Sequence, residues 1–250
     1  MKTTTIIMLL ALLLLGLGAF GQDTLSDPEL LQAFDDLRFF DDDVTSLRVR
    51  ITSTKADEVD EAEVLLLFAE IDGEDYTRIE FLSNDDVLGQ IYITTPDGTF
   101  FFAPDLDEPF QVSGNQEVFG DSPAAQTAGI RFAEDYRIVA RRTVTLEDGS
   151  AVLEFDLVTE DLAVAFQKTT VTADAETLRP LSVILFAVSG LPFYEVYFEE
   201  YVTRADDDVY VSVQRIENQI FAGQTTISEI LEIGTDELDP ALFDLAQFGG

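Results

Sequence analysis

The residues that most often carry enzymatic chemistry are missing from this chain. It contains no histidine and no cysteine, which excludes nucleophiles that need an imidazole base, disulfides, and metal sites built from histidine or thiolate ligands. It has no glycine-rich phosphate loop and no nucleophile elbow. We therefore expect a protein that is not an enzyme and that needs no cofactor.

Carboxylates are the one reactive group present in excess, with 49 Asp and Glu residues. A glycosidase needs two of them at a set separation, but this abundance singles out no pair. The runs 41–43 and 206–208 are each three consecutive aspartates that could bind calcium through oxygen ligands. Neither run has the glycine and closing glutamate of a calcium loop, so we interpret both as exposed turns and expect no metal site.

The excess of acidic over basic residues limits which molecules the protein can bind. Lys and Arg number 14, so the formal net charge is −35. Such a field repels phosphate backbones, and we expect no nucleic-acid binding. The acidity serves either solvation, as in a saline habitat, or the binding of cations, and solvation is the simpler interpretation. A hydrophobic fraction of 46% with 20 phenylalanines predicts a folded chain rather than a disordered one.

The N-terminus is typical of an exported protein. A basic start, an apolar run over 6–17 and the small residues Ala19 and Gly21 predict a signal peptide over 1–22 that is cleaved. The alternative is a membrane anchor, but the run is shorter than the ~20 residues that span a bilayer. Because no cysteine follows to carry a lipid, we expect a soluble monomer of one domain, 23–250, in the periplasm, or outside the cell if the source has no outer membrane.

The first predicted element of the mature chain is an amphipathic helix over 27–38. Ser26 is an N-cap candidate, and Pro28 suits the first turn. Its apolar residues recur at helical spacing: Leu30, Leu31, Phe34 and Leu37.

Beyond residue 45 the apolar pattern changes to that of strands separated by Gly, Pro and Asp turns. Two stretches break it: 119–134, a predicted loop with a short helix, and 236–245, which we expect to form another short helix or an ordered end. The connections are short, which favours antiparallel pairing. The predicted strands are 46–54, 62–71, 75–83, 87–94, 99–103, 109–113, 136–146, 150–158, 163–173, 180–188, 193–204, 208–220 and 224–233.

A sheet of about a dozen strands must curl, because each neighbour adds ~20–25° of twist. We therefore expect a mainly β (α+β) fold, in which a curled antiparallel sheet forms an incomplete β-barrel with short helices as a lid or plug. If the helices leave space, the apolar concave face suits an acyl chain; if they fill it, the same residues form an ordinary core. Strand alternation predicts this lining: Ile79, Phe81, Ile91, Phe100, Phe102, Phe155, Leu157, Tyr194, Val196 and Phe198.

Several short motifs occur in an order that resembles the LolA-like family, which sorts lipoproteins to the outer membrane. A strand arginine comes first, followed by a DG turn, an aromatic strand, a proline corner and a closing apolar segment. The motifs are Arg78, Gly89-Gln90-Ile91-Tyr92, 97–104 (DGTFFFAP), Phe119-Gly120-Asp121-Ser122, Asp135-Tyr136, Thr225-Thr226-Ile227-Ser228 and 238–243 (LDPALF).

The resemblance implies a periplasmic carrier without cofactors, whose half-barrel accepts the acyl chains of lipoproteins or other lipids. It also implies that Arg78 holds the lid through hydrogen bonds to lid carbonyls, a role that suits a guanidinium. Alternation, however, places Arg78 opposite Ile79 and Phe81, where a solvated arginine paired with acids is the simpler interpretation.

Two functions remain open at this point. The first is a soluble carrier that takes a lipid or lipoprotein from a membrane donor protein and delivers it to an acceptor. The alternative is a secreted β-rich structural or interaction module with a filled core and no lipid ligand. A hydrolase based on carboxylates is a third possibility without a site signature.

Overall fold

The computed structural model describes most of the chain after the predicted leader. The predicted signal peptide and the aspartates 41–43, 206 and 207 lie outside the described residues. The described ranges are 25–38, 44–56, 58–112, 117–119, 122–123, 130–146, 148–203 and 208–248. No helix within these ranges is both long and apolar enough to cross a membrane.

One antiparallel sheet of 13 strands dominates the described residues. It brings the first strand beside the last, since β1 pairs with β15, and it is not closed, because β6 and β9 are its two edges. From one edge to the other the strands are β6 (Phe110–Val112), β5 (Gly98–Phe102), β4 (Ile91–Thr95), β3 (Glu74–Phe81), β2 (Glu58–Ile71), β1 (Ser46–Lys55), β15 (Gln224–Gly234), β14 (Val209–Asn218), β13 (Pro192–Thr203), β12 (Pro180–Phe186), β11 (Lys168–Asp174), β10 (Ala151–Val158) and β9 (Arg137–Thr145).

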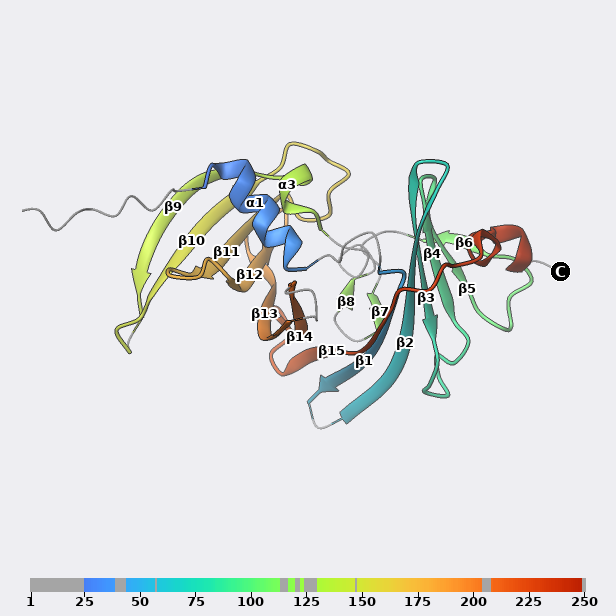
Figure 1. Ribbon diagram of the computed structural model, residues 1–250. Helices are drawn as coiled ribbons and strands as arrows, with labels where there is room; N and C mark the ends of the chain where they lie inside the picture. The colour runs from blue at the N-terminus through green and yellow to red at the C-terminus, as the bar shows by residue number, and fades with distance from the viewer. Residues whose placement is uncertain are drawn as a thin grey trace, which may run out of the picture.

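The sheet curves into a deep U, as the twist of so many strands requires (Figure 1). Two α-helices, α1 (Asp27–Asp36) and α3 (Phe132–Asp135), lie on the inner side of one limb. The 3-10 helices η1 (Pro240–Phe243) and η2 (Leu245–Phe248) lie outside the other limb. The predicted incomplete barrel with short helices is therefore confirmed.

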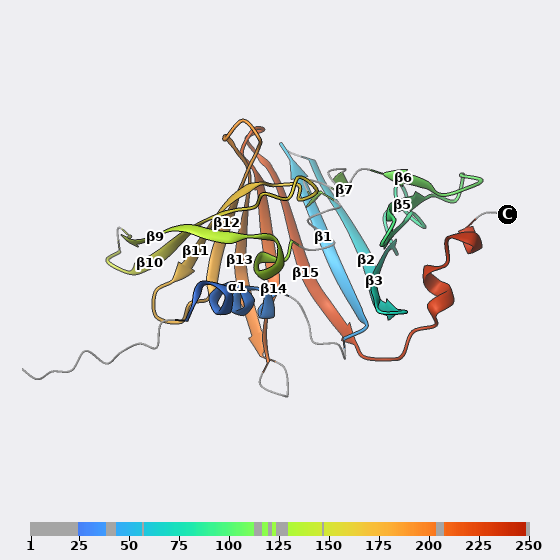
Figure 2. The same ribbon diagram turned by 90° about the horizontal axis from the view of Figure 1, so that it is seen from above.

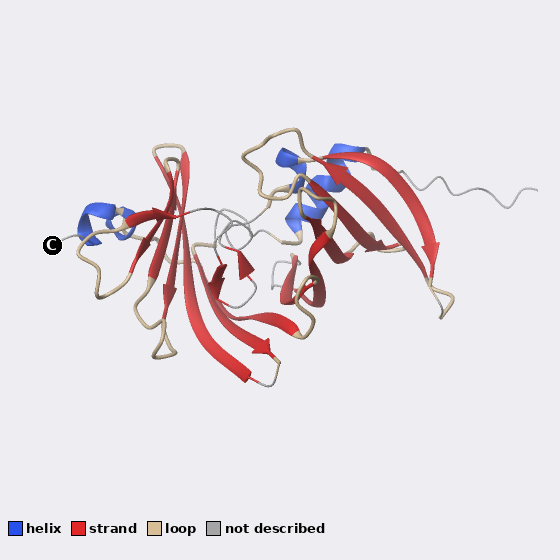
Figure 3. Cartoon of the chain, turned by 180° about the vertical axis from the view of Figure 1, so that it is seen from behind, coloured by secondary structure: helices blue, strands red, loops and turns tan. Residues whose placement is uncertain are grey.

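A short hairpin of β7 (Glu117–Phe119) and β8 (Ser122–Pro123) forms a separate two-stranded sheet. It stands between the two limbs of the U in both front and rear views (Figures 1 and 3). The segment 119–134 was predicted as a loop with a short helix; it contains the end of this hairpin as well as α3.

Local sequence explains where α1 begins. Ser26 and Glu29 form a capping box, in which the Glu29 carboxylate accepts from the Ser26 backbone N–H at 2.9 Å. Pro28 fits the first turn, because it needs no backbone donor there. The helix ends at Asp36, two residues before the predicted end.

The two faces of the sheet can be told apart by following paired residues across it. Phe81, Val64, Val49 and Ile230 are neighbours on one face, and on the same face β15 continues with Ser228 and Thr226. From Thr226 the same face passes through Ile216, Val196, Val183, Val171 and Phe155. Both apolar clusters of the protein lie on this one face, which is the concave face because α1 packs against it.

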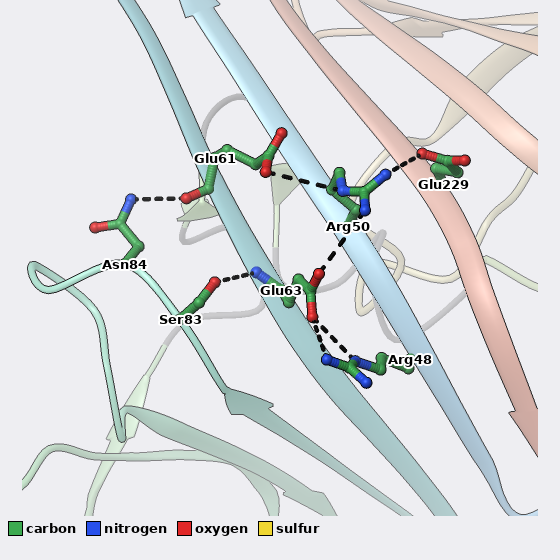
Figure 4. Close-up of polar contacts among 7 residues, drawn as sticks. All are labelled: Arg48, Arg50, Glu61, Glu63, Ser83, Asn84 and Glu229. Carbon is green, nitrogen blue, oxygen red and sulfur yellow. Dashed lines mark hydrogen bonds and ion pairs between the residues drawn. The ribbon is translucent and has the colours of Figure 1, made fainter.

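The outer face of the central strands is charged. Arg50 on β1 contacts Glu61, Glu63 and Glu229 at 3.8, 3.8 and 2.9 Å, and Arg48 reaches Glu63 at 2.5 Å (Figure 4). Cross-strand pairs of opposite charge stabilise neighbouring strands modestly, by roughly 0.2–1 kcal/mol each. The centre of the sheet therefore has one solvated, charged face and one buried, apolar face.

Candidate ligand-binding face

Seven of the ten predicted lining residues lie on the concave face. They fall into two clusters, one on each limb of the U. Ile79 and Phe81 belong to the cluster on β1–β5. The other five belong to the cluster on β10–β14, the helix-covered cluster: Phe155, Leu157, Tyr194, Val196 and Phe198.

The other three predicted lining residues face the opposite way. Ile79 pairs with Tyr92 rather than with Ile91, and Tyr92 in turn pairs with Phe101. Ile91, Phe100 and Phe102 therefore lie on the outer face. Alternation could not assign this face from sequence, because β5 reads GTFFF and is apolar on both sides.

The outer face of this limb is covered by the C-terminal segment. The Phe102 ring lies 5.4 Å from the Phe248 ring, and the Tyr76 ring lies 6.1 Å from that of Phe243. Ile93 is almost fully buried on this side. The apolar pattern of 236–245 predicts a short helix or an ordered end but does not show that this segment buries a second apolar layer on the outer face of the sheet.

Arg78 lies in this outer layer. Its Nη1 donates to the Leu242 carbonyl at 2.9 Å, and its Nη2 pairs with Glu80 at 2.6 Å. Its guanidinium also lies over the Phe248 ring, 5.2 Å from the centroid. Arg78 thus does donate to a backbone carbonyl, but one in the C-terminal segment, whereas α1 and α3 lie on the other face of the sheet.

The helix-covered cluster is closed by α1 and α3. α1 buries Leu30, Leu31 and Phe34 against the sheet, and the Phe34 ring meets that of Phe155 edge-on at 5.7 Å. α3 adds Phe132. The predicted amphipathic pattern of α1 therefore gives its inward face correctly.

A polar clasp joins the two helices. The Asp35 carboxylate on α1 accepts from the backbone N–H groups of Phe132 and Ala133, at 2.9 and 2.8 Å. Arg38 donates to the Ile130 carbonyl at 2.9 Å and lies over the Phe132 ring. Burial raises the pKa of Asp35, although these hydrogen bonds oppose the shift. No local sequence pattern predicts this clasp, because Asp35 and Phe132 are 97 positions apart.

A second buried polar contact lies on the same limb of the sheet. The Tyr136 hydroxyl donates to the Phe166 carbonyl at 2.5 Å, which fixes the connection between β10 and β11 against α3. Burial raises the pKa of Tyr136 above its ordinary value. The hydroxyl therefore remains a donor throughout the physiological pH range.

A polar strip separates the two apolar clusters on the concave face. Gln214, Ser228 and Thr226 face inward from β14 and β15, and Ser53 follows on β1. Among the described residues, no group of three or more acidic side chains is arranged to hold a metal ion. The face thus offers apolar contact on each limb and hydrogen-bonding groups between them.

The fold is similar to those of three solved structures. A LolA superfamily protein from Nitrosomonas europaea has a TM-score of 0.75 at 17% identity, covering 88% of this chain and 98% of its own. An outer membrane lipoprotein-sorting protein domain from Vibrio parahaemolyticus has a TM-score of 0.73 at 16% identity, covering 89% and 97%. A DUF1329 family protein from Desulfovibrio piger has 0.75 at 13%, covering 89% and 97%.

The sequence itself belongs to a family that is described only as an uncharacterized protein, whose model matches residues 73–249. No curated protein matches it in sequence. At these identities the solved structures establish the fold alone.

Proposed function

We propose that this protein is an exported, periplasmic carrier that shields the acyl chains of a lipid or lipoprotein on its concave face. One observation carries this function: both apolar clusters lie on the same concave face, and one of them is covered by two short helices joined to each other by a polar clasp. Residues 23–250 act as one domain, and no covalent bond is made or broken.

Ligand entry exchanges helix contacts for acyl contacts. Burying the three apolar side chains of α1 is worth roughly 5–9 kcal/mol in total, at about 1.5–3 kcal/mol each. An acyl chain of about ten methylenes gains about 8 kcal/mol when it leaves water. The two terms are similar in size, so the helix pair and the ligand can replace each other reversibly.

The acyl chain contacts the seven concave residues predicted from sequence, together with Tyr92 and Phe101. Ile91, Phe100 and Phe102 take no part, because they lie on the outer face, where Phe102 contacts Phe248 of the C-terminal segment. Gln214 and Ser228 offer hydrogen bonds to the polar end of the ligand. We propose that the carrier acts in the sorting of lipoproteins to the outer membrane, because one structural neighbour is described as a lipoprotein-sorting domain. Membrane proteins then donate and accept the cargo of a monomeric carrier.

A filled-core interaction module remains the second candidate. It is favoured by the low exposure of both clusters, in which Phe155 and Leu157 are 2% and 0% exposed. Such a module would bind no lipid at all, which separates it from the carrier.

Titration with a fluorescent fatty acid tests the carrier, and β5 supplies a matched pair of variants. Phe101 faces inward and Phe100 outward, and both are partly buried. We expect Phe101→Ser to weaken binding about tenfold, which corresponds to ~1.4 kcal/mol, and Phe100→Ser to leave it near the parent value. Equal effects of the two changes would refute the concave site, and a parent that binds nothing would favour the module.

A further inference from the structure

Two neighbouring hairpin turns end in exposed apolar side chains. The turn between β12 and β13 carries Val188 and Leu191, which are 91% and 65% exposed. The turn between β14 and β15 carries Ile220 and Phe221, which are 51% and 59% exposed. These four residues, which we call the apolar tip pair, include the most exposed valine and phenylalanine among the described residues.

The two turns lie side by side at one end of the strands (Figure 2). β13 pairs with β14 up to Tyr194 and Asn218, and just beyond this pair the Gln219 backbone N–H donates to the Phe193 carbonyl at 3.0 Å. The apolar tip pair is thus one surface formed by two hairpins.

Hydrogen bonds within each turn hold its side chains outward. The Ala187 N–H donates to the Leu191 carbonyl at 2.9 Å, and the Gly190 N–H donates to that of Ala187 at 2.8 Å. In the other turn, the Asn218 side-chain oxygen accepts from the backbone of Ile220 and of Phe221, both at 2.9 Å. The four apolar side chains are therefore exposed on turns whose backbone conformation is fixed by hydrogen bonds.

This end of the two hairpins carries no charge. The segments 187–194 and 218–228 contain no Asp, Glu, Lys or Arg, in a chain that is 25% charged. The turns at the opposite end of the sheet are acidic, with Asp72, Asp148 and Glu176 among their residues. Charged residues flank the two turns at their own end, with Glu160 and Asp161 in the β10–β11 connection and Lys55 paired with Gln224. The uncharged apolar surface is therefore confined to the two turns.

We propose that the apolar tip pair docks this protein on the interfacial region of a lipid bilayer. Aliphatic and aromatic side chains partition favourably into that region, and the polar groups of Ser189 and Gln219 can meet the head groups. A protein partner would instead need a pocket that fits two separate turns.

Docking would bring the helix-covered cluster close to the membrane. Phe193, which follows the first turn, contacts Tyr194 of that cluster at a ring distance of 4.4 Å, and Phe166 at 6.4 Å. As a step in lipid transfer the inference rests on the proposed function, whereas docking itself does not require it.

A single introduced tryptophan tests the docking, because the chain has none. We expect the fluorescence of Phe221→Trp to shift to the blue with phosphatidylcholine vesicles and to be quenched by brominated acyl chains. Leu146→Trp is the matched control, since Leu146 is also exposed but lies in the turn between β9 and β10 at the opposite end. No change for Phe221→Trp, or an equal change for the control, would overturn the proposal.

Vesicle flotation separates docking from lipid carriage. With about tenfold lost for each side chain, the double variant Val188→Ser/Phe221→Ser should bind vesicles about a hundredfold more weakly, and Leu146→Ser should behave as the parent. The double variant should still bind a fluorescent fatty acid in solution. Vesicle binding without fatty-acid binding by the parent supports docking and refutes the carrier, whereas fatty-acid binding without vesicle binding refutes docking alone.

Discussion

At the scale of single residues, Asp35 and Arg38 hold two helices that the chain separates by almost a hundred residues. The Asp35 carboxylate meets two consecutive backbone donors at the start of α3. A buried backbone N–H that loses its acceptor costs about 1–3 kcal/mol. The position of the helix pair over the sheet therefore depends strongly on this one side chain.

We expect Asp35→Ala to lower the free energy of unfolding by about 2–4 kcal/mol, because two buried donors lose their acceptor. Urea denaturation measures the change. Asp36→Ala is the control, since the exposed Asp36 side chain accepts only from Gln32 one turn earlier. Similar losses for both variants would contradict a specific clasp.

The raised pKa of Asp35 predicts a pH dependence of stability. Because the folded state binds this proton more tightly than the unfolded state, the additional stability that comes from protonating Asp35 is fully present below its ordinary pKa of 3.8 and is lost as pH rises through the raised pKa. The parent should therefore lose stability relative to Asp35→Asn over this window. Urea denaturation of both proteins at a series of pH values would refute the raised pKa if their difference stayed constant or changed in the opposite direction.

Arg78 offers a test of the outer layer. We expect Arg78→Leu to free the C-terminal segment, because the bond to the Leu242 carbonyl and the contact with the Phe248 ring are lost. Limited proteolysis should then cut within 235–248 several times faster, while fatty-acid binding stays near the parent value. Weakened binding with an intact C-terminus would instead support a direct role for Arg78 in holding the lid.

At the scale of elements, α1 is the part that must move if the concave face takes a ligand. Its inner face packs on Phe155, and Asp27 at its start pairs with Arg141 on β9. These contacts hold α1 against the sheet on the side away from α3. A covalent link between residues 27 and 141 would therefore keep α1 packed against the sheet.

We expect a short bis-maleimide link between Asp27→Cys and Arg141→Cys to slow fatty-acid uptake at least tenfold. The chain contains no native cysteine, so the reaction is specific to the introduced pair. Stopped-flow fluorescence measures the rate, and the same variant with both thiols blocked separately is the control. Uptake at the same rate in both samples would show that the ligand enters without movement of α1.

The elements show what periodicity can and cannot predict. Strands such as β1, with alternating Val49 and Ile51 against Arg48 and Arg50, reveal both their extent and their faces. β4 and β5 do not, because apolar residues occupy both of their faces. The predicted strand 87–94 begins at Ile91 instead, after a connection in which Asn84 and Gly89 have positive φ values.

At the scale of the whole molecule, the curl of the sheet followed from the number of strands, and the predicted half-barrel is the observed one. The C-terminal layer outside the curve did not follow, since it depends on a long-range contact between 240–248 and β3–β5. The candidate site was predictable on the limb with clear alternation. The helix clasp on that same limb and the outer layer on the other limb could not be predicted, because both depend on contacts between residues far apart in the sequence.

The net charge of −35 predicts a strong response to salt. Self-repulsion destabilises the compact state, and ions screen it over a Debye length that falls from about 30 Å at 0.01 M to about 10 Å at 0.1 M. We expect the midpoint of thermal unfolding to rise steeply over this range of NaCl and more slowly above it. A flat response at low salt would show that the carboxylates do not destabilise the fold.

Native mass spectrometry of the protein purified from cells, without added lipid, tests lipid carriage most directly. We predict a bound species with the mass of a lipid or lipoprotein, which is released when a fluorescent fatty acid competes for the concave face. A chain that is free of ligand and also fails to bind the fatty acid would contradict the carrier and leave a filled-core module.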